Sequence, residues 1–229
     1  MSRRFISLLV LLVIVSLFTL ATFAIAFELP KWFPFSAERS LNEWEDKIFR
    51  GRVIYEIETN GPLDYLHALS RSTASAIFYK IRQRFRAQEY PMFSWKWKVA
   101  KFPDQEKLKG RQGIERDDYA ARVYVIFPSM FILNSKVLEY VWDEAAPLES
   151  ISSSPYSANI KLIVAHSGNK DIGRWVFEER NIIADYRKAF GRDPSLKVGA
   201  IALMSDSDTI GDTSEAYFDD IKMGYINER

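Results

Sequence analysis

Residues 93–99 read Phe-Ser-Trp-Lys-Trp-Lys-Val, the cleanest alternation of apolar and polar side chains in the chain. Successive side chains of a β-strand point to opposite faces, so one face of this run is wholly apolar and the other carries a serine and two lysines. The pattern predicts a strand with one buried face. It favours core positions for Trp95 and Trp97 over the alternative, a flat platform on which sugars stack.

Similar short apolar runs recur along the chain, separated by turn residues. Residues 74–85 fit either a helical stripe or a strand face, and we expect them to pair in antiparallel fashion with 92–99. A second strand pair is expected between 160–165 and 174–177. Further strands are expected at residues 53–58, 119–127, 137–142, 196–204 and 216–223.

One short helix is expected after Asn181, whose side chain can cap its first turn, and Gly191 is placed to end it. Many short strands with a single helix indicate an all-β antiparallel sandwich, because a parallel α/β domain would need more crossover helices.

The composition excludes several classes of protein. The 229 residues are 48% hydrophobic, enough for one core, and the formal net charge is +1. Without a basic excess, we expect no nucleic-acid partner. The chain has no cysteine, so it has no disulfide framework, thiolate metal site or cysteine nucleophile.

The N-terminus predicts export. Arg3 and Arg4 precede an uncharged apolar run over residues 5–26, which ends in Ala-Ile-Ala, the small-x-small pattern of a cleavage site. We interpret residues 1–26 as a signal peptide and 27–229 as one periplasmic β-sandwich domain. The alternative is an uncleaved inner-membrane anchor over residues 5–26, since about 20 apolar residues can span a bilayer.

Several phrases resemble a family of exported bacterial proteins known only as a domain of unknown function. They are Trp-Lys-Trp-Lys-Val (95–99), Asp-Asp-Tyr-Ala-Ala-Arg-Val-Tyr-Val (117–125), Glu-Arg-Asn (179–181) with Asp-Tyr-Arg (185–187), and Ala-Leu-Met-Ser-Asp-Ser-Asp (202–208). The resemblance spans residues 40–225 and implies no activity. The phrase Tyr-Phe-Asp-Asp-Ile (217–221) also resembles the last strand of galactose-binding-like jelly rolls, which supports the sandwich more than any ligand.

Two tryptophans are candidate stacking platforms for a sugar. Trp142 and Trp175 are less flanked by apolar alternation than Trp95 and Trp97. Exposed aromatic rings offer flat apolar faces, and neighbouring carboxylates or amides can take a sugar's hydroxyl groups. The alternative is again a core position.

Charged residues cluster in two stretches that could form one ionic network linking neighbouring strands. The members are Asp117, Asp118, Arg122, Glu178, Glu179, Arg180 and Asp185. Arginine and carboxylates within apolar runs must be paired, so we interpret the network as structural or ligand-orienting. The alternative is an acid/base pair for glycoside hydrolysis, with Asp118 and Glu179 as its carboxylates.

The acidic turn at residues 206–212 could hold calcium through Asp206 and Asp208, although it lacks the ligands of an EF-hand. The jelly-roll resemblance adds Asp220. The alternative is a plain acidic turn capped by its own side chains. The two histidines, His67 and His166, lack the spacing of a zinc motif, which argues against zinc.

Together these patterns predict an envelope-associated binding module without chemistry of its own. Its expected partner is an envelope glycan or an envelope protein, and its expected ligand site comprises Trp142, Trp175, Asp118, Arg122, Glu179 and Arg180. A glycan hydrolase and a structural subunit of a membrane-anchored envelope complex are the alternatives.

Overall fold

The computed structural model describes residues 29–35, 41–60, 63–108 and 117–226. The expected signal peptide or anchor, residues 1–26, lies outside these ranges. Within them, the helices fall short of the length and hydropathy that crossing a bilayer requires.

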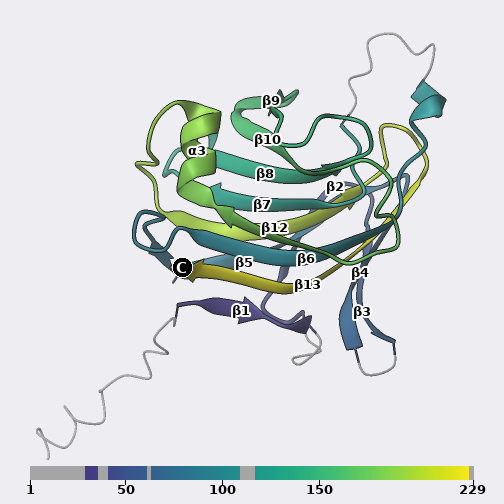
Figure 1. The fold of residues 1–229 in the computed structure, drawn as a ribbon, viewed down its shortest axis with the longest axis horizontal. Coiled ribbons are helices and arrows are strands. Elements are labelled where there is room, and N and C mark those ends of the chain that lie inside the picture. The colour runs from purple at the N-terminus through teal and green to yellow at the C-terminus, as the bar shows by residue number, and fades with distance from the viewer. Residues whose placement is uncertain (1–28, 36–40, 61–62, 109–116, 227–229) are drawn as a thin grey trace, which may run out of the picture.

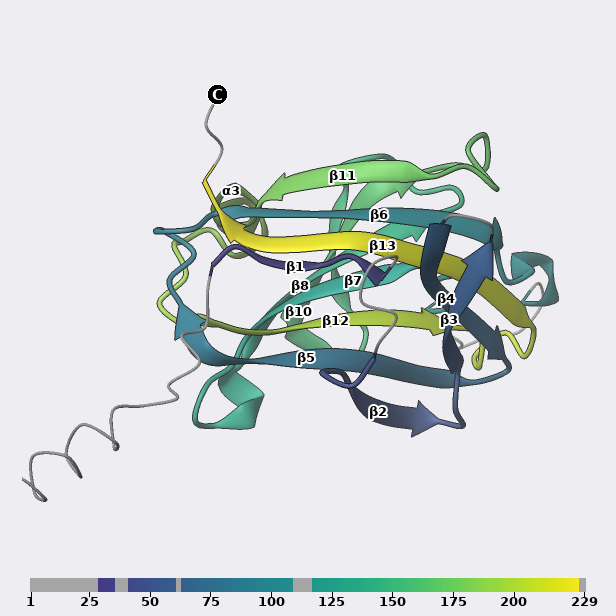
Figure 2. The same cartoon turned by 90° about the horizontal axis from the view of Figure 1, so that it is seen from below.

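Two β-sheets pack face to face in two layers (Figures 1 and 2). The seven-stranded sheet contains, in spatial order, β2 (Glu45–Arg50), β5 (Ala74–Phe85), β12 (Val198–Asp206), β7 (Arg122–Phe127), β8 (Lys136–Asp143), β10 (Ser157–Ser167) and β9 (Ile151–Ser154). The six-stranded sheet contains β11 (Val176–Asn181), β6 (Met92–Lys101), β13 (Thr213–Tyr225), β4 (Leu63–Arg71) and β3 (Ile54–Asn60), with β1 (Lys31–Phe33) pairing with β13. Two short 3-10 helices, η1 (Gln105–Leu108) and η2 (Ile132–Asn134), lie in connections. The predicted all-β sandwich is confirmed.

Two predicted strand pairings are wrong. Residues 74–85 do form a strand, but β5 pairs with β2 and β12 in one sheet while β6 pairs with β11 and β13 in the other. Likewise β10 and β11 lie in different sheets, and β10 instead pairs in parallel with β8. The alternation of apolar residues fixes which face of a strand is buried, but it does not identify the strand's neighbour.

The core lies between the two sheets and is rich in aromatic rings. Trp95 and Trp97 of β6 are fully buried, as predicted. The ring centroid of Trp95 lies 5.1 Å from that of Tyr140, and the centroid of Trp97 lies 5.9 Å from that of Trp142, both on β8. These rings therefore join the two layers. Offset and tilted aromatic packing of this kind stabilises a core beyond the area that it buries.

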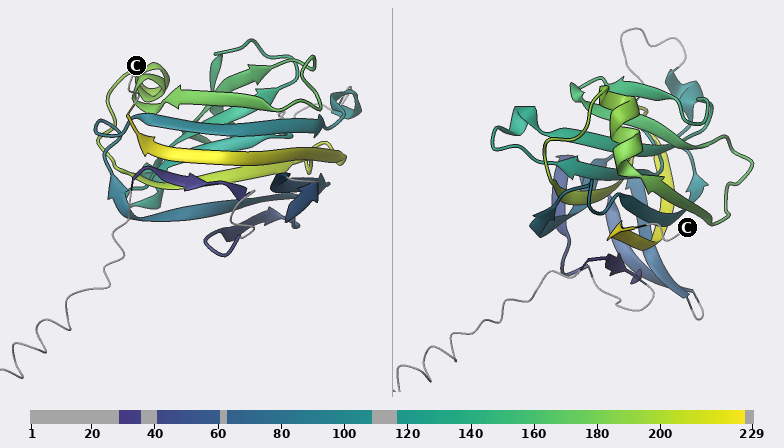
Figure 3. Two further views of the ribbon diagram at one scale, coloured as in Figure 1. Left: turned by 60° about the horizontal axis from the view of Figure 1, so that its bottom comes forward. Right: turned by 60° about the vertical axis from the view of Figure 1, so that its left-hand side comes forward.

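The predicted helix is confirmed as α3 (Ile182–Phe190), which lies at one end of the sandwich (Figures 1 and 3). The Asn181 side chain accepts hydrogen bonds from the backbone N–H groups of Ile183 and Ala184, both at 3.1 Å. Gly191 ends the helix with φ of 69°, the left-handed conformation that glycine adopts without strain. The Tyr186 ring anchors the helix against Phe127 at 5.0 Å.

Candidate functional site

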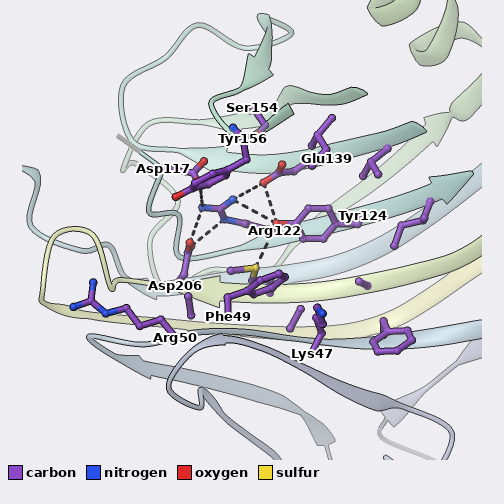
Figure 4. Close-up of a pocket in the computed structure, with 18 of the residues that line it drawn as sticks. Lys47, Phe49, Arg50, Asp117, Arg122, Tyr124, Glu139, Ser154, Tyr156 and Asp206 are labelled. Carbon is purple, nitrogen blue, oxygen red and sulfur yellow. Dashed lines mark hydrogen bonds and ion pairs between the residues drawn. The ribbon is translucent and has the colours of Figure 1, made fainter. Parts of the chain in front are cut away.

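A groove of about 570 Å³ opens on the outer face of the seven-stranded sheet (Figure 4). Its residues come from all seven strands of that sheet, from the turn that joins β9 to β10, and from the segments just before β7 and just after β12. The volume lies within the range typical of small-ligand sites.

The floor of the groove is made by small side chains at the centre of the sheet. Ala74 and Ala76 of β5 and Ala202 of β12 lie on one face, beside Met204. An alanine reaches only one carbon beyond the backbone, so a row of alanines leaves a hollow where neighbouring residues are larger. The same alternation that buries Ile201 and Leu203 in the core therefore puts this apolar floor on the outside.

Two exposed aromatic rings stand at the rim of the groove. Phe49 of the edge strand β2 is 61% exposed, and Tyr156, in the turn between β9 and β10, is 77% exposed. Figure 4 shows them on opposite sides of the polar cluster described next. Exposed rings beside a concave apolar surface are available for stacking.

One end of the groove is polar and is organised by Arg122 of β7. Its guanidinium donates to both carboxylate oxygens of Asp206, at 2.9 and 2.6 Å, and to Glu139 Oε1 at 2.7 Å. Asp117 Oδ2 lies 3.6 Å from Arg122 Nη2. The strand order explains the cluster, because β12 and β8 flank β7 and bring an acid to each side of the arginine.

The cluster holds more acid than base. Three carboxylates surround one guanidinium, and all four side chains are nearly fully buried. Burial is the main cause that raises the pKa of Asp117 to about 6, although Arg122 opposes the shift. Asp117 Oδ1 is also buried without a hydrogen-bond partner. An unpaired buried oxygen is costly, so this atom is suited to accept a hydrogen bond from a ligand.

Of the predicted ligand residues, only Arg122 lines the groove. Asp118 precedes it by four positions, but its oxygens accept from the backbone N–H groups of Thr209 and Ile210 at 3.2 and 2.6 Å. Asp118 therefore fixes the β12–β13 turn.

The prediction that Trp142 is a stacking platform is wrong. The side chain is fully buried, and its indole N–H donates to the Gly168 carbonyl at 2.9 Å. The strand over residues 137–142 is central in its sheet, so its inward face belongs to the core. Trp175 is 38% exposed and packs edge-on against Tyr65 at 5.6 Å, beside the other sheet. A stacking role for Trp175 stays a prediction.

The predicted ionic network divides into two separate clusters. Arg180 of β11 donates to Asp185 at 2.9 and 2.8 Å and to Glu149, and Tyr140 donates to Asp185 at 2.9 Å. This second cluster ties β11 and α3 to β8, away from the groove. Glu179 accepts from the Tyr225 hydroxyl at 3.0 Å.

The predicted acid/base pair does not face a common cleft. Asp118 precedes a strand of the seven-stranded sheet, whereas Glu179 lies in the edge strand β11 of the six-stranded sheet, and neither lines the groove.

The predicted calcium ligands are also divided. Asp206 and Asp208 lie with Asp118, but Asp220 pairs with Lys96 at 2.7 Å in the other sheet. Both oxygens of Asp206 already bind Arg122, so a calcium ion there would require the arginine to release one of them. Calcium binding by Asp206 and Asp208 stays a prediction.

The sequence patterns did not predict three residues that line the groove: Phe49, Tyr156 and Glu139. Phe49 lies in a strand whose residues are all exposed, and Tyr156 lies in a serine-rich loop, so neither shows a periodic signal. Glu139 interrupts the apolar run of residues 137–142, and this single buried charge was the signal that could have revealed it.

The fold and the groove define a β-sandwich domain with a candidate binding surface on one sheet. The chain belongs to the family described as "Protein of unknown function (DUF3047)", whose model matches residues 42–222. This confirms the resemblance drawn from the sequence. No curated protein matches the chain.

Solved structures show distant likeness. The family 11 carbohydrate-binding module of the cellulase Lic26A-Cel5E of Clostridium thermocellum has 10% identity and a TM-score of 0.47, over 87% of this chain and 96% of that one. The CBM22-1 xylan-binding domain from Paenibacillus barcinonensis Xyn10C has 9% identity and a TM-score of 0.43, over 86% and 95%. A cellulase derived from Cel12A of Rhodothermus marinus has 12% identity and a TM-score of 0.44, over 78% and 94%. Because all three TM-scores lie below 0.5, any functional conclusion has to come from the groove's own residues.

Proposed function

We propose that the chain is a binding module that holds a segment of a carbohydrate in the groove of the seven-stranded sheet. The observation that carries the proposal is the combination of exposed Phe49 and Tyr156 rings, an alanine floor and a buried carboxylate cluster within one groove.

The chemistry of a sugar matches this combination. A pyranose ring has an apolar C–H face, which packs on an aromatic ring or an alanine floor, and a rim of hydroxyl groups, which need hydrogen-bond partners. Asp117 Oδ1, which has no partner, and the acid-rich cluster around Arg122 can accept from such hydroxyls. The excess of carboxylate over guanidinium favours neutral or amino sugars over acidic ones.

The experiment is binding of the purified full chain to an array of bacterial envelope glycans, followed by calorimetry with the best ligand. Tyr156→Ala and Phe49→Ala should each weaken binding roughly 5- to 10-fold or more, the loss expected of about 1 kcal/mol or more for a stacked ring. Phe177→Ala is the matched control, because Phe177 is 57% exposed but belongs to the other sheet.

Trp175→Ala tests the competing surface in the same assay. If only Trp175→Ala weakens binding, the ligand occupies the six-stranded sheet and the groove proposal fails. If no glycan binds, the carbohydrate proposal fails and an envelope protein becomes the better candidate partner.

We propose further that the domain works in the periplasm. The support is the basic pair Arg3 and Arg4 followed by the apolar run to Ala26. Fractionation of cells that carry a C-terminally tagged chain should recover it outside the cytoplasm. N-terminal sequencing then separates a cleaved leader, which gives a mature chain starting at Phe27, from an inner-membrane anchor.

A hydrolase is the second candidate, favoured by Asp117 alone. A carboxyl with a pKa of about 6 in an open groove can donate a proton near neutral pH. Prolonged incubation with the glycan that binds best, with reducing ends measured, tests this candidate. New reducing ends that disappear in Asp117→Asn would support hydrolysis, and an unchanged glycan would leave a binding module.

A further inference from the structure

The outer face of the six-stranded sheet carries a histidine between carboxylates. His67 lies on β4, with Glu56 directly opposite it on β3 and Tyr217 directly opposite it on β13. Glu58 lies two positions from Glu56 and therefore on the same face. The β3–β4 pair is at the edge of its sheet, as Figure 2 shows, and none of these residues lines the groove.

The hydrogen bond to Glu215 identifies which nitrogen of the His67 ring carries a hydrogen. Nε2 lies 2.9 Å from Glu215 Oε1, the same oxygen to which the Tyr217 hydroxyl donates at 2.8 Å. A carboxylate oxygen only accepts, so Nε2 carries the hydrogen, and in the neutral ring Nδ1 presents a lone pair. The Tyr217 ring stacks on the imidazole at 4.7 Å and an interplanar angle of 13°, which holds its orientation.

Nδ1 of His67 has no hydrogen-bond partner, although the residue is only 5% exposed. It points at two carboxylates, with Glu58 Oε1 at 3.5 Å and Glu56 Oε1 at 3.7 Å. These separations are too long for good hydrogen bonds. A lone pair that faces two carboxylates is an unfavourable arrangement unless a cation lies between them.

The two separations from Nδ1 are close to those between neighbouring ligands of a metal ion. Two ligand atoms at about 2.1 Å from a tetrahedral Zn²⁺ are roughly 3.4 Å apart. The three ligand atoms of Glu56, Glu58 and His67 lie within 4.8 Å of one another. Glu215 completes the pattern, because histidine ligands of metals generally donate their second N–H to a carboxylate.

We propose that Glu56, Glu58 and His67 bind a divalent transition-metal ion such as Zn²⁺, with Glu215 as the residue that positions the imidazole. A nitrogen ligand makes the site poorly suited to calcium or magnesium, which prefer oxygen alone. Three protein ligands leave a fourth position for water or a ligand oxygen. The site requires the register of three strands, and a search for a H-x-x-H motif could not reveal it.

The experiment titrates Zn²⁺ into the chelator-treated full chain in competition with a chromogenic chelator. One ion should bind per chain. His67→Gln should weaken binding by more than about 100-fold, and Glu215→Gln, which leaves all three ligands in place, by roughly 10- to 100-fold. The control is His166→Gln. His166 Nε2 lies 3.1 Å from Asp171 and its Nδ1 lies 3.5 Å from Glu178, so its Nδ1 faces one carboxylate where that of His67 faces two.

Co²⁺ in place of Zn²⁺ gives a second readout, since its visible absorption reports the ligands directly. The spectrum of Glu215→Gln should differ from that of the native chain, because a merely structural role for Glu215 would not change it. Should His67→Gln fail to fold, Glu56→Gln decides, because Glu56 is exposed and its replacement leaves the core intact. The proposal is overturned if the native chain binds no Zn²⁺, or if binding survives both His67→Gln and Glu56→Gln. The first result would mean that the three side chains form no metal site.

Discussion

Two buried arginines, Arg122 and Arg180, organise the charged side chains of this molecule. Arg122 and Arg180 each hold two or more carboxylates, but in different surroundings. Arg122 and its acids form one end of an open groove, whereas Arg180 joins a helix to two strands. We therefore expect the two clusters to respond differently to substitution.

The first prediction concerns Asp117. Its folded-state pKa of about 6 lies above the ordinary 3.8, so the folded chain holds this proton more tightly than the unfolded chain does. The stabilisation that the proton gives is complete below pH 4 and is lost as the pH rises to 6. Relative to wild type, Asp117→Asn should therefore gain free energy of unfolding between pH 4 and pH 7, by up to about 3 kcal/mol.

Urea denaturation at both pH values measures this difference. Asp193→Asn is the control, because Arg187 lowers the pKa of Asp193. The free energy of unfolding of this variant, relative to wild type, should therefore not rise with pH. An Asp117→Asn difference that is the same at pH 4 and pH 7 would show that the carboxyl is not perturbed.

The second prediction concerns Arg180. Removing its guanidinium leaves Asp185 buried without its charged partner, so Arg180→Ala should lower the free energy of unfolding by about 3–5 kcal/mol. Arg187→Ala, which breaks a fully exposed pair with Asp193, should leave the melting temperature unchanged. A normal melt for Arg180→Ala together with lost ligand binding would instead assign Arg180 to a binding site.

The sequence predicted individual strands and the helix from local patterns, but it did not predict which strands pair. Alternation over residues 93–99 correctly predicted β6 and its buried tryptophans, and Asn181 and Gly191 marked both ends of α3. Neighbouring strands could not be predicted, because β5 and β6 are adjacent in sequence yet belong to different sheets. The groove and the His67 site depend on those pairings, so they became visible only in the fold.

The third prediction concerns the start of α3. Asn181 satisfies two backbone N–H groups, so Asn181→Ala should cost about 1 kcal/mol of stability. Asn181→Asp keeps an oxygen in the same position and should retain most of that stability. Chemical denaturation of the three proteins checks this, and equal losses for both variants would mean that the cap does not act through its oxygen.

The sandwich as a whole has one shared core and two different outer faces. The seven-stranded sheet carries an apolar groove with an acidic end, and the six-stranded sheet carries His67 among carboxylates. Because the packed core separates the two outer faces, substitutions on one face should leave the other intact. The proposed glycan and metal sites can therefore be tested independently.

Methyl NMR of the alanine side chains during titration with the best-binding glycan tests the groove most directly. Our account predicts that the methyl signals of Ala74, Ala76 and Ala202, which form the groove floor, shift saturably with ligand. Those of Ala68 and Ala216, buried in the six-stranded sheet, should stay in place. Saturable shifts confined to the six-stranded sheet, with the floor alanines unchanged, would contradict it.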